Sequence, residues 1–151
     1  MIGDPNTPAS RGVSIIPYRQ GKFAISKRLS PSDKCPGLWQ FPGGLVEVEE
    51  DTVVAAQREL HEETGLNIPS QRFIFIGESP PLAGYKGEKY IGYRYGVVLF
   101  ENEHLLNPEP EKHTAWEWVT GAELKNRAML FGIMTYAFDF QRLLLSTNER
   151  P

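Results

Sequence analysis

The chain has 151 residues, of which 40% are hydrophobic and 23% are charged, and a formal net charge of −3 at pH 7. These values are typical of one globular domain with a sizeable core, and no apolar run is long enough to cross a bilayer, so we expect no membrane partner. The slightly acidic charge gives no broad field that would attract nucleic acid, and the single cysteine, Cys35, excludes an internal disulfide framework.

The chain is expected to begin with a flexible arm and a hairpin. Residues 1–10 are polar and proline-rich and predict the arm, followed by a single domain at 11–148. Residues 12–18 and 22–27 are predicted strands, joined by a turn at 19–21. No signal peptide is visible, so we expect a cytoplasmic protein, or a secreted one if the sequence is a trimmed mature form.

An acidic helix is predicted at about residues 51–64, after a turn-rich loop at 28–37 and a strand-like apolar run at 38–41. Gly65 follows the helix, where a left-handed residue often ends one. The inward-facing residues at helical spacing are Val53, Ala56, Leu60 and Thr64.

The second half of the chain is predicted to return to strands and to end in a helix. Strands are expected at 72–77, 90–101 and 116–120, with a short helix at 122–126. Residues 130–145 repeat apolar side chains at helical spacing and predict an amphipathic helix that covers a sheet face. Strands on both sides of a central helix, followed by a terminal helix, predict an α/β sandwich.

Three glutamates of the acidic helix point to a metal site. Glu59, Glu62 and Glu63 are spaced i, i+3, i+4 and share one face, where each exposed like-charge pair costs about 0.2–0.5 kcal/mol. A cation would relieve that repulsion, and carboxylates with backbone oxygens are the hard ligands that suit Mg²⁺ or Mn²⁺. Gly43 and Gly44, just before the helix, allow the backbone to approach a ligand closely.

Two further charges are expected to support this face. Glu50 and Arg58 lie outside the three-glutamate face and are predicted to form an ion pair between the loop and the helix. Such a pair would fix the direction of the loop carbonyls.

These residues resemble the Nudix box over 23 residues, with every fixed position filled at the family's spacing. The matching residues are Gly44, Glu50, Arg58, Glu59, Leu60, Glu62, Glu63, Gly65 and Leu66. The resemblance implies the Nudix fold, an α/β/α sandwich with a mixed sheet and a loop–helix–loop motif. It also implies metal-dependent hydrolysis of a diphosphate linkage in a nucleoside diphosphate derivative, with a carbonyl of Gly43 or Gly44 joining the metal ligands.

The resemblance leaves the general base open. In the family this carboxylate comes from the box or from a later loop. Glu59 is the candidate in the box, and Glu111 the candidate in the proline-rich loop before the predicted strand at 116–120, with Glu88 a weaker alternative.

A finer resemblance to the MutT-like branch lies at 41–44, 109–112 and 116–118. That branch hydrolyses nucleoside triphosphates, including damaged ones, to monophosphates, and we expect a (d)NTP or modified (d)NTP as substrate. Aromatic residues that could stack on a base, and basic residues that could bind phosphates, are candidates for substrate binding. They are Phe41, Tyr93, Trp116, Trp118, Lys27 and Arg28, and the aromatic ones could equally be core residues.

Other functions remain open at this stage. If the basic residues form one channel, capped RNA or a diphosphoinositol polyphosphate becomes a credible substrate by family analogy. A non-catalytic nucleotide sensor is an alternative of another class, and a homodimer is an alternative to a monomer.

Overall fold

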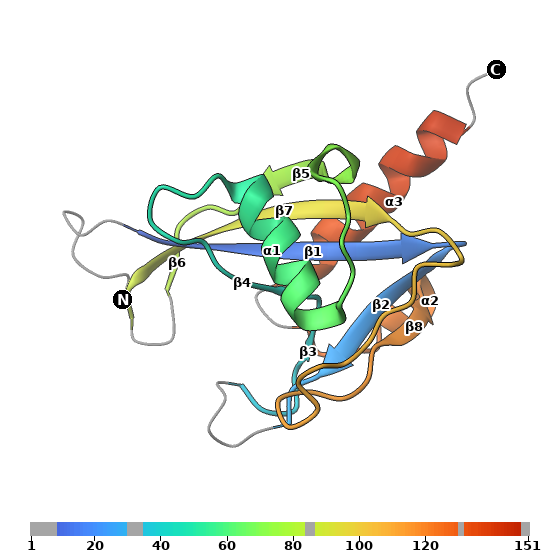
Figure 1. Cartoon of the computed structure of the whole chain (residues 1–151), viewed down its shortest axis with the longest axis horizontal. Helices are drawn as coiled ribbons and strands as arrows, with labels where there is room; N and C mark the ends of the chain where they lie inside the picture. The colour runs from blue at the N-terminus through green and yellow to red at the C-terminus, as the bar shows by residue number, and fades with distance from the viewer. Residues whose placement is uncertain (1–8, 30–34, 84–86, 130–131, 149–151) are drawn as a thin grey trace.

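The computed structural model describes residues 9–29, 35–83, 87–129 and 132–148. A mixed sheet lies between two helices (Figure 1). Helix α1 (Thr52–Thr64) covers one face and helix α3 (Met134–Asn148) covers the other. This is the α/β/α sandwich that the sequence predicts. Among the described residues, no helix has both the length and the apolarity needed to cross a membrane.

The parallel strands β1 (Ser10–Arg19) and β7 (Lys89–Val98) form the middle of the sheet. The remaining strands are β2 (Lys22–Lys27), β3 (Trp39–Gln40), β4 (Gly43–Leu45), β5 (Ile74–Glu78), β6 (Leu82–Ala83) and β8 (Glu117–Thr120). The other pairs among these described strands are antiparallel, and the main path runs β3-β2-β1-β7-β5. Outside the strands, η1 (Ser70–Arg72) is a 3-10 turn and α2 (Gly121–Leu124) a short helix.

Two strands, β4 and β2, pair with different parts of the same edge of β1. This arrangement positions the functional site. Strand β4 pairs with β1 at Gly12–Ser14, whereas β2 pairs with β1 at Tyr18 and Arg19. Beyond the hairpin, β2 pairs with β3 and β8. The chain from β3 to β4 therefore passes from one half of the sheet to the other, and the Ile15 amide donates to the Pro42 carbonyl on the way (2.8 Å).

Alternating residues of β1 and β7 fill two cores. On the α1 face, Val13, Ile15 and Val97 pack against Ala55 and Leu60. The α3 face has its own buried cluster, which includes Ile16, Phe23, Val119, Ala137 and Phe140. Full burial of one aliphatic side chain contributes about 1.5–3 kcal/mol, so both helices are held to the sheet mainly by apolar contact.

A fully buried arginine lies on the α3 face. Arg94 donates from Nη1 to the Ser14 hydroxyl (2.9 Å), and its guanidinium lies over the Tyr136 ring. Gly92 leaves the room for this side chain, because a Cβ there would come within 2.6 Å of Arg94 Cζ. Burial lowers the pKa of Arg94.

A bidentate ion pair ties the turn after α1 to the end of β7. Arg72 Nη1 and Nη2 lie 2.6 and 2.7 Å from the two carboxylate oxygens of Glu103. The same carboxylate accepts from the Phe100 amide (2.7 Å), and Arg72 also donates to the Val98 carbonyl (2.8 Å). The hydrogen bond from Arg72 lowers the pKa of Glu103 below its usual 4.5.

We expect Glu103→Gln to lower the free energy of unfolding at pH 7 by about 1–3 kcal/mol, because charge-assisted bonds are lost. The pKa of Glu103 is lowered on folding, so its stabilisation is complete above pH 4.5 and disappears as the pH falls through the folded value. Urea unfolding of both proteins between pH 7 and pH 2 should therefore show curves that converge in acid. A difference in free energy of unfolding between the two proteins that stays constant with pH would contradict this account.

Most predicted elements are confirmed, with shifted ends. The hairpin turn uses left-handed Gln20 and Gly21, with φ of 51° and 78°, and Gly65 ends α1 with φ of 79°. The expected arm at 1–10 is too long by at least one residue, because Ser10 belongs to β1; residues 1–8 lie outside the described residues. The predicted strand at 116–120 begins only at Glu117, so Trp116 precedes it.

The other differences concern short elements and helix ends. The short helix is shifted from 122–126 to Gly121–Leu124, where Thr120 and Glu123 form a capping box. The terminal helix begins at Met134, and residues 130–131 of its predicted range lie outside the described residues. Strands β4 and β6 are too short for a periodic pattern and were not predicted.

Candidate active site

Arg58 organises the loop before α1. Its Nε and Nη2 each lie 2.9 Å from a carboxylate oxygen of Glu50, and Nη2 also donates to the Leu45 carbonyl (3.0 Å). The Glu47 amide donates to the same carboxylate (2.9 Å). The hydrogen bonds from Arg58 lower the pKa of Glu50 to about 2. The predicted ion pair is confirmed, and it fixes the loop that leads from β4 into α1.

Glu59 packs directly under β4. Its side chain is only 12% exposed and accepts from Arg58 Nη1 at 2.9 Å. Burial is the main cause that raises the pKa of Glu59, and the negative charge of Glu62 adds to it. Gly44 makes this position available, because a Cβ on Gly44 would collide with the Glu59 carboxylate.

We expect Gly44→Ala to move Glu59 and to lower the free energy of unfolding by about 1–3 kcal/mol, the usual cost of overpacking. Gly77→Ala is the matched control, because a Cβ at Gly77 would meet Tyr136 at an ordinary 3.5 Å. That control should stay within about 0.5 kcal/mol of the wild type. Urea unfolding measures both, and equal stabilities of the two variants would contradict the packing of Glu59 against Gly44.

Glu63 is the most perturbed carboxylate of the helix. Burial raises its pKa well above 4.5, and the charges of Glu59 and Glu109 raise it further. The Gly43 amide is a hydrogen-bond partner of this carboxylate, but Glu63 Oε2 is buried and has no partner among the described residues. A buried carboxylate oxygen without a donor is unfavourable, so this position suits a positively charged ligand.

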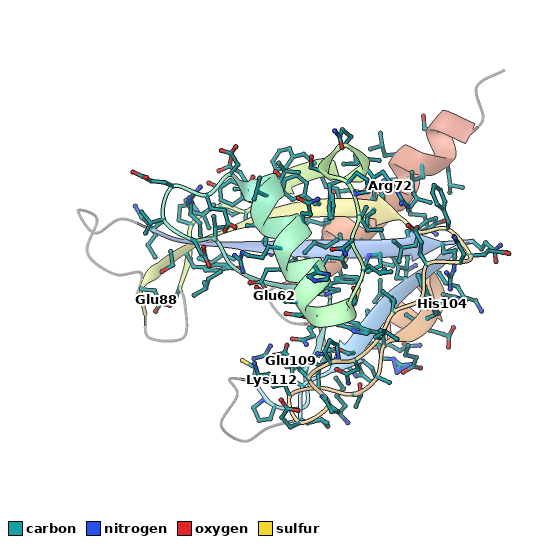
Figure 2. The ribbon with its side chains drawn as sticks, viewed as in Figure 1. Glu62, Arg72, Glu88, His104, Glu109 and Lys112 are labelled. Atoms are coloured by element: carbon teal, nitrogen blue, oxygen red, sulfur yellow. The ribbon has the colours of Figure 1, made fainter. Side chains whose placement is uncertain are left out.

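Glu62 occupies a different environment. Its side chain is 53% exposed, and it is joined to Arg58 Nη1 at 3.4 Å. Figure 2 shows it on α1, with Glu109 and Lys112 on the loop below the end of the helix. Within the described part of the chain, no three His, Cys, Asp or Glu side chains come close enough to hold one ion directly. The three glutamates share a helix, but only Glu59 and Glu63 are withdrawn from solvent.

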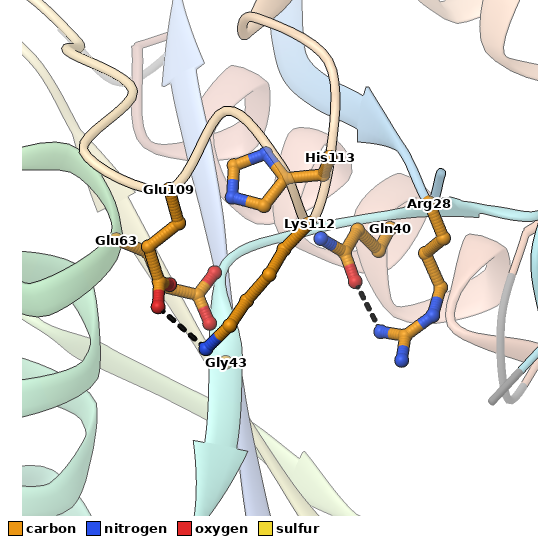
Figure 3. A pocket seen from close by; sticks show the side chains of 7 residues that line it. All are labelled: Arg28, Gln40, Gly43, Glu63, Glu109, Lys112 and His113. Atoms are coloured by element: carbon orange, nitrogen blue, oxygen red, sulfur yellow. Dashed lines mark hydrogen bonds and ion pairs between the residues drawn. The ribbon is translucent and has the colours of Figure 1, made fainter. Parts of the chain in front are cut away.

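A polar pocket of about 220 Å³ opens beside Glu63 (Figure 3). It lies where β2, β3 and β4 approach the end of α1 and the loop at 109–113. Its lining residues are Arg28, Gln40, Gly43, Glu63, Glu109, Lys112 and His113. Figure 3 shows the carboxylates of Glu63 and Glu109 directed into the same space. The pocket thus combines two acidic groups with two basic ones.

The loop carboxylate in the pocket is Glu109, not the Glu111 expected from the sequence. Glu111 is exposed and is not among the lining residues. The loop turns tightly, with the Lys112 amide donating to the Glu109 carbonyl (3.0 Å), so Glu109, Lys112 and His113 face one side. Their i, i+3, i+4 spacing is the sequence signal that could have identified them. Lys112 Nζ lies 2.7 Å from Glu109 Oε2.

The predicted basic residues separate in the structure. Arg28 lines the pocket and donates from Nη1 to Gln40 Oε1 (2.6 Å), a partner that the sequence did not indicate. Lys27 is exposed at the end of β2 and is not among the lining residues.

The predicted aromatic residues lie outside the pocket lining. Phe41 is 5% exposed within the α3-face core, so it is a packing residue. Tyr93 and Trp118 pack against the α1-face core, and Arg19 lies over the Trp118 ring. Trp116 is nearest the site, because its Nε1 donates to the Glu63 carbonyl (3.2 Å) and its ring centre is 4.9 Å from that of His113.

The carboxylates near the pocket fit a divalent cation. Burial raises the pKa of Glu59 and of Glu63, and the negative charge of Glu109 adds to both shifts. Glu63 Oε2 has no hydrogen-bond donor among the described residues. Oxygen donors of this type suit Mg²⁺ or Mn²⁺, which commonly keep several water ligands and so do not need a complete set of protein ligands.

Comparisons with known proteins agree with this geometry. A family model described as the NUDIX domain matches residues 8–136. An RNA pyrophosphohydrolase of Brucella ovis is 35% identical in an alignment of 124 residues that covers 70% of this chain and 70% of the relative. One from Rhizobium meliloti is 33% identical over 148 residues, covering 83% of this chain and 86% of the relative. A MutT NUDIX hydrolase from Burkholderia pseudomallei has the same fold, with a TM-score of 0.73 at 22% identity over 88% of this chain and 98% of that one.

Proposed function

The chain belongs to the Nudix family of hydrolases and is a pyrophosphohydrolase, and from this premise we propose that it hydrolyses a phosphoanhydride bond in the 5′-polyphosphate of a nucleotide. The observation that carries the proposal is Glu63, whose buried Oε2 has no hydrogen-bond partner among the described residues, in a pocket that also contains Glu109, Arg28 and Lys112.

Glu59 and Glu63 would hold Mg²⁺ or Mn²⁺, together with a carbonyl of Gly43 or Gly44, and Glu62 would contribute from the solvent side. When bound, such an ion neutralises diphosphate oxygens and makes a water more acidic. The Arg58–Glu50 pair keeps the loop and Glu59 in place for this purpose.

The loop at 109–113 and Arg28, which directly follows β2, would bind and activate the reactants. Glu109, which lines the pocket whereas Glu111 does not, would accept the proton of the attacking water. The water oxygen forms a bond to phosphorus, the bridging P–O bond breaks, and the leaving phosphate or pyrophosphate keeps the electron pair. Arg28 and Lys112 would bind the phosphate oxygens, with Gln40 orienting Arg28.

The 5′ end of an RNA is the leading substrate, because the similar curated proteins carry the name RNA pyrophosphohydrolase. The pocket of about 220 Å³ is smaller than the roughly 300–1,000 Å³ of a typical ligand site, so it suits the phosphate chain and leaves the rest of the substrate outside. A free (d)NTP is the second candidate, favoured by the net charge of −3, which does not attract a long polyanion.

A direct comparison distinguishes the two substrates. Phosphate and pyrophosphate release would be measured with Mg²⁺ or Mn²⁺ on a 5′-triphosphorylated RNA oligonucleotide and on a panel of (d)NTPs. A kcat/KM at least tenfold higher for the oligonucleotide supports the RNA end, and the reverse ratio supports the free nucleotide. Absence of turnover on every polyphosphate would refute the proposed function.

A further inference from the structure

His113 has one ring nitrogen without a hydrogen-bond partner in the described part of the chain. The residue is 3% exposed and lines the pocket, and its Nε2 is buried with no hydrogen bond among the described residues. Its other polar atoms are engaged. The amide donates to the Glu109 carbonyl (3.4 Å), and the carbonyl accepts from Asn107 Nδ2 (2.9 Å). The ring is therefore held in place among the residues that line the pocket, and Nε2 is its buried atom without a hydrogen bond in the described part of the chain.

The hydrogen bond of the other ring nitrogen defines the chemistry of Nε2. Nδ1 lies 2.9 Å from the Thr114 carbonyl oxygen, which can only accept, so Nδ1 carries the hydrogen. In the neutral imidazole, Nε2 is then an acceptor. Contact with the Trp116 ring fixes the ring plane further.

A water is the partner that best suits this acceptor. Ionised phosphate oxygens are acceptors themselves and would be repelled by the lone pair of Nε2. The pocket can hold several waters, since each occupies about 30 Å³ in the liquid and the pocket measures about 220 Å³. The carboxylates of Glu63 and Glu109 line the same space and offer acceptors for the second hydrogen of such a water.

We propose that His113 is a positioning residue for the attacking water. One O–H of the water donates to His113 Nε2 and the other to the Glu109 carboxylate, which directs an oxygen lone pair toward phosphorus. In the reaction the water oxygen bonds to phosphorus, the bridging P–O bond breaks, the leaving phosphate group keeps the electron pair, and Glu109 takes the proton of the water. The inference rests on the proposed function and adds to it a residue outside the Nudix box.

Direct coordination of a metal by His113 is the competing role. Among the described residues, no group of three His, Cys, Asp or Glu side chains converges on one ion, so His113 does not join Glu63 and Glu109 as a preformed ligand set. Hard ions such as Mg²⁺ also favour oxygen over imidazole. The role through water therefore fits the arrangement better.

Two substitutions of His113 distinguish the role of Nδ1 from the role of Nε2. In His113→Asn the amide can still donate to the Thr114 carbonyl but no atom reaches the position of Nε2, whereas Gln is long enough to place its amide oxygen there. We expect His113→Asn to lower kcat by about 10²-fold, the effect of a misplaced reactant, with KM and the Kd for Mn²⁺ within twofold of the wild type. His113→Gln should have a kcat at least tenfold higher than that of His113→Asn.

The measurements are steady-state kinetics on the preferred substrate, Mn²⁺ titration by calorimetry, and the thermal midpoint of each variant. A wild-type kcat in His113→Asn would overturn the inference, as would a rise in KM alone or a tenfold weaker Mn²⁺ affinity. Equal losses in both variants with a lowered thermal midpoint would show a merely structural role and also overturn it. The activity of the wild-type protein distinguishes failure of this inference from failure of the proposed function. If the wild type turns over substrate and His113→Asn is equally active, only this inference is refuted. If the wild type turns over no substrate, the proposed function itself is refuted.

Discussion

Glu63→Gln is expected to lower kcat by about 10²–10³-fold while leaving the fold intact. A metal-bound oxygen stabilises developing charge by several kcal/mol, and each 1.36 kcal/mol corresponds to a factor of ten in rate. Glu63 should carry much of this effect, because its Oε2 is buried without a donor among the described residues and burial raises the pKa of the carboxyl group. Gln has the same shape but lacks the charge that holds the cation.

The same substitution should not destabilise the metal-free protein. A buried carboxylate with a raised pKa and acidic neighbours is unfavourable when ionised, so Glu63→Gln should equal or exceed the wild type in free energy of unfolding at pH 7 without metal. Glu62→Gln is the matched comparison on the same helix. It should also reduce turnover, but its metal-free stability should stay within about 0.5 kcal/mol of the wild type, because that side chain is 53% exposed.

Addition of Mn²⁺ makes the experiment decisive. An ion that binds only the folded state stabilises it by about 2.7 kcal/mol at 100 times its Kd. Urea unfolding with and without Mn²⁺ should show this gain for the wild type and little of it for Glu63→Gln. If Mn²⁺ stabilises Glu63→Gln as much as the wild type, Glu63 is not a metal ligand.

The parts of the fold that depend on local sequence were predictable. The acidic helix at Thr52–Thr64 follows from its apolar spacing, and its end follows from Gly65, whose φ of 79° disfavours other residues. The hairpin turn at Gln20 and Gly21 is local in the same sense. Strand β4 is different, because two of its three residues are glycines and its pairing with β1 joins residues about thirty positions apart.

The site was predictable in its chemistry but not in its detail. Helical spacing placed Glu59, Glu62 and Glu63 on one face, yet it could not show that two are withdrawn from solvent and one is exposed, because burial depends on β4 and the loop at 109–113. The predicted strand at 116–120 is likewise wrong for Trp116, which precedes β8 and contacts α1 through the Glu63 carbonyl. Tertiary contacts, not periodicity, decide these positions.

Glu109→Gln and Glu111→Gln form the sharpest pair of variants in this chain. The two glutamates are two residues apart in one loop, but only Glu109 lines the pocket beside Glu63. If Glu109 accepts the proton of the attacking water, Glu109→Gln should lower kcat by about 10²–10⁴-fold with little change in KM. Glu111→Gln should keep kcat and KM within twofold of the wild type, because its exposed side chain is outside the pocket lining.

Loss of the ion pair with Lys112 cannot account for such an effect. The pair is partly exposed, at 52% for Lys112 and 29% for Glu109, and exposed pairs contribute at most about 1 kcal/mol. Lys112→Met removes the same pair but keeps the carboxylate, so it should raise KM through weaker phosphate binding and leave most of kcat. Steady-state kinetics of the three variants tests this assignment. A large loss of kcat in Glu111→Gln, or a loss in Lys112→Met equal to that in Glu109→Gln, would move the base away from Glu109, because neither change removes the carboxylate that faces Glu63.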